Sequence, residues 1–457
     1  MRKTYKISSF ILCLFCINTT VYSQIITTVA GGATGHGGYW GEGAAATAAQ
    51  LNLFYGLFID NDNNFYITDA GLDSRILKVD AISGIIHTII GTGTAGYNGD
   101  GIPATIAQLN APEAIAMDNF GNIYVYDYGN NRIRKIDGAT GIISTYAGNG
   151  SFGSGGDGGP ATDASIDGGA IAFDSEGNLY YTGTRKIRVI TRDGMINTVI
   201  GNGLSGITGD GVPATATFIA PVKGIAFDRN DNMYIVDSTE AIRKITHATG
   251  IITRVAGTGD NLYAYSGDGI AATTCHIAAW GIAIDDTGNI YIADQANSRI
   301  EKVDTFGIIN TIAGTGIAGF SGDNGPAIDA KLSHPENLAL DRCNNVYVGD
   351  FVNARLRKVT YHATCAITDS ASLKTTTINT NNKVSVYPNP MHDEVNITGA
   401  NKITEITITN PVGQCVHSQK YSNTSVRVDM QGLPAGVYVM KIIDETGLQT
   451  ITNVIKE

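Results

Sequence analysis

Six positions of the chain carry the side chains best suited to bind a ligand, and each lies five residues before an aspartate that recurs along the sequence. The recurring aspartates are Asp60, Asp118, Asp174, Asp228, Asp285 and Asp341. The positions before them are Tyr55, Glu113, Gly169, Lys223, Trp280 and Glu336. Two aromatic rings, two carboxylates and an amine could hold a polar ligand with an apolar face, such as a sugar or a peptide. The alternative is that these are variable, solvent-exposed residues at loop ends.

A second set of carboxylates recurs in loops of the pattern Gly-Asp-Gly-x-Pro-Ala-Thr. Its members are Glu42, Asp100, Asp157, Asp210, Asp268 and Asp323. Carboxylates are calcium ligands, but one carboxylate per loop is too few for a dedicated site. Asp-Gly-x-Pro is turn chemistry, and Pro-Ala-Thr predicts a short helical turn that packs on neighbouring strands. We therefore expect scaffolding loops and no cofactor, with a divalent cation in these loops or in the ligand site as the alternative.

The elements that position these residues follow from a repeat. Between residues 114 and 148, four short runs rich in Ile, Val and Tyr are separated by turn formers, which predicts a four-stranded antiparallel meander. The recurring aspartates are spaced by 58, 56, 54, 57 and 56 residues. Four strands at that period predict a six-bladed β-propeller, an all-β fold. The first strands of the blades converge on an axis, so the six positions would meet in one funnel.

The two ends of the propeller are predicted to meet in one blade. The fourth-strand motif occurs as IITTVAG at 25, before any first strand, and no copy follows Thr360. The simplest arrangement makes residues 25–31 the outer strand of the blade whose other strands lie between Glu336 and Thr360. This pairing would leave no open seam in the ring.

The repeat resembles the NHL repeat. GNIYVYD with NNRIRKID at 121–137, and GNIYIAD with NSRIEKVD at 288–304, carry the resemblance, which covers about residues 25–360. The resemblance implies an NHL-like six-bladed propeller. The third and fourth repeats depart from it, because TGTRKIRVIT and VDSTEAIRKIT shorten the turn between second and third strands and lose the Asn-x-Arg pattern. We expect those two blades to present a different loop surface.

Related six-bladed propellers that are metal-dependent lactonases and lyases suggest the competing function. Metal chemistry needs several converging His or carboxylate ligands. Glu113 and Glu336 could hold a divalent ion, but no histidine occupies a funnel position and no third ligand is identified. Spacing indicates no Ser-His-Asp or Cys-His arrangement. A metal-dependent hydrolase or lyase using Glu113 and Glu336 is therefore the alternative to a noncatalytic binding protein.

Composition and the N-terminus indicate an exported globular protein. A chain of 457 residues, 43% hydrophobic and 16% charged, can bury a large core and still form a second domain. The net charge of −11 argues against a nucleic-acid partner. Basic residues in the first six positions, an apolar run over 10–17 and Val-Tyr-Ser before Gln24 predict a signal peptide at 1–23. Because no run reaches the roughly 20 apolar residues of a membrane span, we expect no transmembrane segment in the mature chain.

Four cysteines follow the predicted signal peptide: Cys275, Cys343, Cys365 and Cys415. An exported chain with four cysteines can carry disulfides. In a meander the first turn and the end of the third strand lie on the same face, so we predict a disulfide between Cys343 and Cys365. Cys275 falls in a loop on the opposite face. The alternative is that all four are unpaired and buried.

The sequence pattern changes after Cys365. Residues 366–383 are polar, rich in Thr and Asn and without periodicity, which is typical of a linker. Residues 384–457 contain short alternating strands without the blade period and predict a small Ig-like β-sandwich. YPNP at 387, ITNPVGQCV at 408, LPAGVYVMKI at 433 and the terminal ITNVIKE resemble the type A sorting domain of the type IX secretion system. The resemblance implies Sec export and then the outer-membrane secretion machinery as a partner, usually followed by removal of this domain.

The sequence thus predicts a signal peptide (1–23), a propeller (24–365), a linker (366–383) and a sorting domain (384–457). We expect a protein that is secreted or held at the outer cell surface. Its expected function is noncatalytic binding of a peptide, protein or glycan at the axial funnel.

Overall fold

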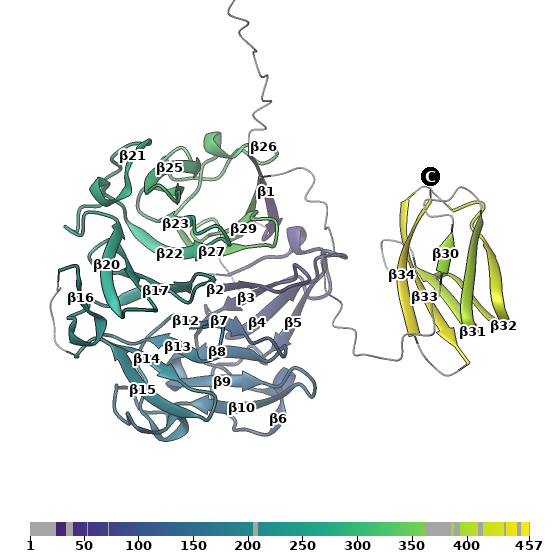
Figure 1. The fold of residues 1–457 in the computed structure, drawn as a ribbon, viewed down its shortest axis with the longest axis horizontal. Helices are drawn as coiled ribbons and strands as arrows, with labels where there is room; N and C mark the ends of the chain where they lie inside the picture. The colour runs from purple at the N-terminus through teal and green to yellow at the C-terminus, as the bar shows by residue number, and fades with distance from the viewer. Residues whose placement is uncertain are drawn as a thin grey trace, which may run out of the picture.

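The structure is a computed structural model that describes residues 24–32, 40–52, 54–71, 73–203, 209–361, 385–387, 394–409, 415–433, 436–445 and 449–456. The described residues up to 361 form six sheets arranged around an axis, and those from 385 onward form another sheet (Figure 1). The all-β class and the six-bladed propeller predicted from the repeat are confirmed.

Each propeller sheet is an antiparallel meander that runs outward from the axis. The first strands are β2 (Phe54–Ile59), β7 (Pro112–Met117), β12 (Ile171–Phe173), β17 (Val222–Phe227), β22 (Ala279–Ile284) and β27 (Pro335–Leu340). The second strands are β3 (Phe65–Asp69), β8 (Ile123–Asp127), β13 (Leu179–Thr182), β18 (Met233–Asp237), β23 (Ile290–Asp294) and β28 (Val346–Asp350). The third strands are β4 (Arg75–Val79), β9 (Arg132–Ile136), β14 (Ile187–Ile190), β19 (Ala241–Ile245), β24 (Arg299–Val303) and β29 (Arg355–Thr360). The fourth strands are β5 (Ile86–Ile90), β10 (Ile142–Ala147), β15 (Met195–Ile200), β20 (Ile251–Ala256), β25 (Ile308–Ala313) and β1 (Ile25–Ala30).

Five of the described sheets also have a short outer strand that the sequence pattern does not predict. These strands are β6 (Ile102–Pro103), β11 (Gly159–Pro160), β16 (Val212–Pro213), β21 (Ile270–Ala271) and β26 (Gly325–Pro326). Each pairs with the start of a fourth strand, as Ile102 does with Ile143. In the first blade the corresponding contact is an isolated bridge between Ala45 and Ile85. Because the fourth strand would otherwise be an open edge, the five short strands and the bridge in the first blade protect part of every blade from edge-to-edge pairing.

The predicted short helical turns in the interblade loops are present as 3-10 turns. They are η1 (Ala46–Ala48), η2 (Ala104–Ile106), η4 (Ala161–Asp163), η5 (Ala214–Ala216), η6 (Ala272–Thr274) and η7 (Ala327–Asp329), and a further turn, η3 (Tyr128–Asn130), joins β8 to β9. The first alanine of each interblade turn is buried, because the turn inserts its apolar side between adjacent blades.

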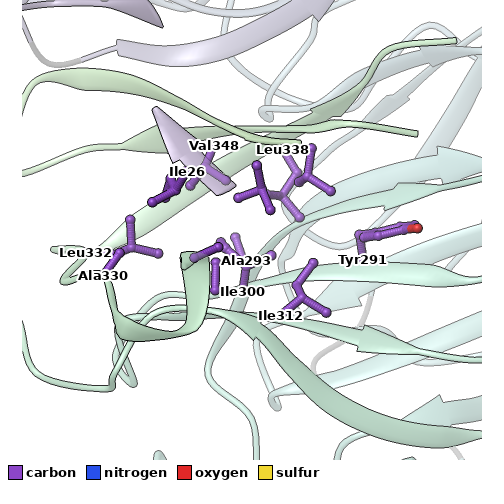
Figure 2. Close-up of a cluster of buried hydrophobic side chains, with 13 residues drawn as sticks. Ile26, Tyr291, Ala293, Ile300, Ile312, Ala330, Leu332, Leu338 and Val348 are labelled. Carbon is purple, nitrogen blue, oxygen red and sulfur yellow. The ribbon is translucent and has the colours of Figure 1, made fainter. Parts of the chain in front are cut away.

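The N-terminal strand closes the ring, as predicted. β1 lies between β29 and β26 in the sixth sheet, with Ile26 opposite Val359 and Ile25 opposite Thr360. Figure 1 shows purple β1 beside green β29 and β26. Ile26 is fully buried and packs with Val348 and Leu338 of its own blade and Ile300 of the fifth (Figure 2). The closure is therefore a packed part of the core as well as a strand pairing.

The recurring aspartates serve as hairpin caps. In the second blade Asp118 accepts hydrogen bonds from the Asn122 backbone N–H at 2.9 Å and from the Asn122 side-chain amide at 2.7 Å. The same pair of bonds recurs at all six aspartates. Because the cap fixes where each first strand ends, it also fixes which residues of that strand face the axis.

The described C-terminal residues form a sheet with its own core. Its strands are β30 (Ser385–Tyr387), β31 (Glu394–Thr409), β32 (Cys415–Asp429), β33 (Gly436–Asp444) and β34 (Gln449–Lys456). The sequence has two short alternating runs, EVNITG at 394 and ITEITITN at 403, where the structure has the single long β31. The register of β31 against β32 shifts between Thr398 and Ile403, so one half of β31 pairs with β30 and the other with β33. Val395, Ile406 and Met440 are fully buried in the core of this sheet.

Several predictions fall on residues outside those that the structure describes. These are the signal peptide at 1–23, the linker at 366–383 and the expected disulfide partner Cys365. Within the described ranges, no helix has the length and apolar character needed to cross a membrane.

Candidate ligand-binding funnel

A β-bulge places the predicted funnel residue in each regular first strand. In β7 the register shifts between Pro112 and Ala114, so Glu113 has no partner opposite it in β8. The same shift occurs at Lys223 in β17 and at Glu336 in β27. In β2 and β22 the shift spans two residues, of which Tyr55 and Trp280 are the first. Bulges re-aim side chains, and they are frequent beside functional sites.

The bulged residues surround a cavity of about 500 Å³ at the end of the axis where the first strands begin. Five of the six predicted positions line it: Tyr55, Glu113, Gly169, Lys223 and Trp280. Blade six contributes Asn337 in place of Glu336. The strands are close here, since a Cβ on Gly281 would lie 2.2 Å from the Glu336 carbonyl oxygen. The cavity has the size of an ordinary small-molecule site.

Of the two glutamates at predicted funnel positions, Glu336 is buried and Glu113 is partly buried. Burial raises the pKa of Glu113 to about 7, and it raises the pKa of Glu336 to about 7 although a hydrogen bond from Gln295 opposes the shift. Gln295 Nε2 donates to Glu336 Oε1 at 2.8 Å, while Oε2 is buried with no hydrogen-bond partner among the described residues. Burial also raises the pKa of Tyr55, and Glu336 and Glu113 add to that shift. Near neutral pH the cavity therefore offers, at Glu113, a carboxyl group that can donate as well as accept a proton.

Lys223 is held by a partner that the sequence analysis did not identify. Its Nζ lies 2.6 Å from Glu240 Oε1, and Glu240 is 2% exposed. Lys223 Nζ also donates to the Ala279 carbonyl at 3.3 Å and lies 5.2 Å from the centre of the Trp280 ring. Glu240 occupies the shortened turn of the fourth blade with a φ of 62°. The amine is thus fixed against the indole.

The third blade opens one side of the funnel. β12 has three residues where the other first strands have six. Gly168, Gly169 and the short turn Thr182–Thr184 line the cavity there. Two exposed aromatic rings stand at the same mouth, Tyr128 at 43% and Phe152 at 65% exposure. Sequence reasoning missed both rings, because they lie in loops outside the first strands, although the shortened third repeat did point to an unusual loop surface.

Below the bulged residues, the first strands present an aliphatic ring to the axis, which we call the waist. It consists of Leu57, Ile115, Ile171, Ile225, Ile282 and Leu338. The alternation of side chains along a strand places this ring two residues beyond the bulge. The funnel therefore has a polar and aromatic wall above an apolar floor.

The loop carboxylates hold the loops to their own blades, as predicted for scaffolding. Asp100 accepts a bond from the buried Arg134 at 2.8 Å and from Thr145 at 3.1 Å. Asp323 forms an ion pair with Arg357 and accepts a hydrogen bond from Thr28 Oγ1, each at 2.7 Å. The remaining four carboxylates likewise bond to third-strand or fourth-strand groups.

The residues that the structure describes contain no group of three or more His, Cys, Asp or Glu side chains placed to hold a metal ion. Glu113 and Glu336 therefore have no third ligand of these types in the described funnel. His276, which lies a few residues before a funnel position, instead faces Thr258 Oγ1 at 2.9 Å.

Of the cysteines, Cys275 is free and buried. Cys343 is disulfide-bonded. Because Cys365 lies outside the described residues, its pairing with Cys343 stays a prediction that nonreducing peptide mapping would test.

The C-terminal residues 385–457 match the family described as the secretion system C-terminal sorting domain. This match agrees with the order of motifs from YPNP to the terminal strand. It shows that the chain carries a sorting domain of the type IX system, which directs proteins to the cell surface or the medium.

The propeller is similar to proteins of known sequence or structure. The protein SUPPRESSOR OF QUENCHING 1, chloroplastic, of Arabidopsis thaliana is 30% identical over 270 residues, which cover 55% of this chain and 25% of that protein. This chain therefore spans about a quarter of the length of that relative. A structural genomics protein of unknown function from Bacteroides thetaiotaomicron VPI-5482 has a TM-score of 0.56 at 17% identity, covering 74% of this chain and 76% of that one. An auxiliary nutrient binding protein from the same organism has a TM-score of 0.53 at 16% identity, covering 74% and 76%.

Together, the fold and the comparisons define the class of protein. The chain is a six-bladed β-propeller of NHL-like repeats followed by a type IX C-terminal sorting domain. It is an exported protein of the cell surface or the medium.

Proposed function

We propose that the exported propeller is a noncatalytic binding protein that takes a polar ligand with an apolar face, a glycan or a peptide, in the axial funnel. The observation that carries the proposal is the cavity of about 500 Å³, where Tyr55 and Trp280 stand beside Glu113 and Lys223. Aromatic rings beside charged groups are typical anchors of such ligands.

Two further features support this function. The amine of Lys223 is already fixed by Glu240 and the Trp280 ring, so ligand binding would not have to order it. Tyr128 and Phe152 extend the aromatic surface from the cavity to the mouth. The nutrient-binding propeller of Bacteroides thetaiotaomicron, which shares the fold, is named as a binding protein, and this is consistent with the proposal.

The test is glycan and peptide array binding by the purified chain, followed by titration of the best ligand against Trp280→Ala. We expect this substitution to cost about 2 kcal/mol or more, roughly thirtyfold in affinity, because an aromatic anchor is lost. The melting temperature should change little, since Trp280 lies partly exposed at the cavity. Phe306→Ala, at a ring that is 90% exposed in the turn between β24 and β25, is the matched control and should leave binding unchanged.

Added chelator should have no effect on binding. The alternative, a metal-dependent hydrolase or lyase, would replace this proposal under two conditions. The protein would have to turn over a lactone or a related substrate, and that activity would have to be abolished both by chelation and by Glu113→Gln or Glu336→Gln. Unchanged affinity in Trp280→Ala would refute the funnel as the binding site.

A further inference from the structure

The end of the axis opposite the funnel holds a second cavity, which we call the lower well. It has a volume of about 400 Å³ and is open to solvent. All the residues that line it are Leu, Ile, Met, Phe or Ala. Its wall includes five of the six waist residues, a lower ring formed by the last residue of each first strand, and the residues between them. The lower ring is Ile59, Met117, Phe173, Phe227, Ile284 and Leu340.

The lower well is better suited to hydrocarbon than to water. A water molecule in a protein cavity needs two to four polar partners, and the side chains of this wall offer none. The lower-ring side chains are only partly buried, so apolar surface faces solvent at the mouth. Covering such surface yields about 25 cal/mol per Å². The funnel is different in kind, because its wall carries Glu113 and Lys223.

The mouth of the lower well is acidic. Each lower-ring residue is followed directly by one of the recurring aspartates. Lys244 and Lys358 lie within 4 Å of two of these carboxylates, Asp228 and Asp341. The described residues place no such ion pair at the other four.

An adjoining cavity of about 760 Å³ shares Met117, Phe173, Phe227 and Ile284 with the lower well. Its charged lining residues are Asp118, Asp174, Asp228, Asp231, Asp285 and Asp286 against Lys135, Arg192 and Arg229. The resulting field disfavours an anion at the mouth and favours a cation.

From the apolar wall and the acidic mouth we infer that the lower well binds an aliphatic chain that carries a cationic head group. The aliphatic chain of the ligand lies along the axis between the waist and the lower ring, and its cationic head group stays in water beside the aspartates. This site shares the waist with the funnel but lies on its other side, and it does not depend on the proposed function. A fatty-acid anion would place its carboxylate beside like charges, and an uncharged chain would gain only the apolar contact.

Isothermal titration of the full-length chain with decyltrimethylammonium, decanol and decanoate, each kept below its micelle concentration, tests the inference. We expect saturable binding of one decyltrimethylammonium per chain, with decanol weaker and decanoate at least tenfold weaker. Raising the salt concentration from about 0.02 M to about 0.5 M should weaken the binding of decyltrimethylammonium more than that of decanol, because salt screens the charges at the mouth.

The double variant Met117→Gln/Ile284→Thr makes the lower ring polar at nearly constant volume. It should weaken the binding of decyltrimethylammonium at least tenfold. Met195→Gln/Ile328→Thr, the same changes on outer elements, is the matched control and should bind like the parent chain. A second variant, Ile59→Phe, keeps the wall apolar but fills the space and should also weaken binding. Trp280→Ala, in the funnel, should have no effect.

The inference fails if decyltrimethylammonium shows no saturable binding, or if decanoate binds as tightly. It also fails if folded Met117→Gln/Ile284→Thr and Ile59→Phe bind like the control. If Trp280→Ala alone loses binding, decyltrimethylammonium binds in the funnel and the assignment to the lower well is wrong.

Discussion

The charged residues of the funnel differ in how freely they can meet a ligand. Lys223 is held by Glu240 and Glu336 by Gln295, whereas no hydrogen bond to the Glu113 carboxyl occurs among the described residues. Glu113 is therefore the acid best placed to form a hydrogen bond with a ligand. Its burial also makes it sensitive to pH.

Glu113→Gln/Glu336→Gln should stabilise the protein at pH 8 and have little effect at pH 4.5. Burial raises the pKa of each acid from 4.5 to about 7 in the folded chain. The stability linked to each acid is thus fully present below about pH 4.5 and is lost as the pH rises through 7. Melting temperatures of the parent and the variant across this range provide the measurement. Glu176→Gln, at an exposed acid, is the control, and an equal gain at both pH values would contradict the assigned cause.

The funnel positions were predicted from the spacing to the recurring aspartates, and five of the six line the cavity. The spacing is reliable because the hairpin cap at each aspartate fixes the end of the first strand. Glu336 differs because the side chain of a bulged residue is not constrained by the alternation of the strand, and a neighbour such as Gln295 can hold it. The Lys223–Glu240 pair could not be predicted, because it depends on the left-handed backbone of Glu240.

At the scale of the blade, the third strands differ at one buried position, which is Leu77 in the first blade. The third strand carries a buried arginine at Arg134, Arg188, Arg243 and Arg357, and each reaches the loop carboxylate. In the fifth blade the equivalent residue is Glu301, which is fully buried with both carboxylate oxygens unpartnered among the described residues. Burial, with Asp294 and Asp268 nearby, raises the pKa of Glu301 well above its usual value.

Glu301→Gln should therefore raise the melting temperature at pH 8 by several degrees and leave it nearly unchanged at pH 5. The raised pKa means that stability falls as the pH rises, since an ionised Glu301 would be a buried, uncompensated charge. Glu301→Arg, which restores the residue found in four other blades, should pair with Asp268 and also stabilise the protein at pH 8. Calorimetry at the two pH values decides, and a destabilised Glu301→Gln variant at pH 8 would show that the carboxylate has a favourable role.

The closing strand gives a second prediction for an element. A chain that starts at Ala33 lacks β1, and this exposes the edge of β29 and removes Ile26 from the core between the fifth and sixth blades. We expect a lower melting temperature and aggregation, because the open edge can pair with another chain. Calorimetry and light scattering provide the measurement. Unchanged melting would mean that the ring is stable without closure.

The blades and their closure were predictable because a strand meander needs only local pairing and a period. The two-residue outer strands were not, since Ile102–Pro103 and its equivalents are too short to show any alternation. The long β31 was read as two strands because its register shift near Thr398 interrupts the pattern.

At the scale of the whole molecule, the sorting domain should act as an address. The described C-terminal sheet has its own buried core, which includes Val395, Ile406 and Met440. A chain that ends in the linker near Thr375 should fold with the melting temperature of the propeller but remain in the periplasm. Cell fractionation measures where the shortened chain is found, and binding to the funnel ligand measures whether its propeller is folded. Normal surface delivery of the shortened chain would refute the role.

The pairing of Ile25 with Thr360 has a mechanical consequence. Whatever precedes residue 24 and whatever follows residue 361 is joined to the propeller at one end of the same strand pair. A pull between the two attachments would load this pair from its open end and separate its hydrogen bonds one after another, as in unzipping, while the other blades carry none of the force. Under such a pull, we expect the sixth blade to be the first to yield.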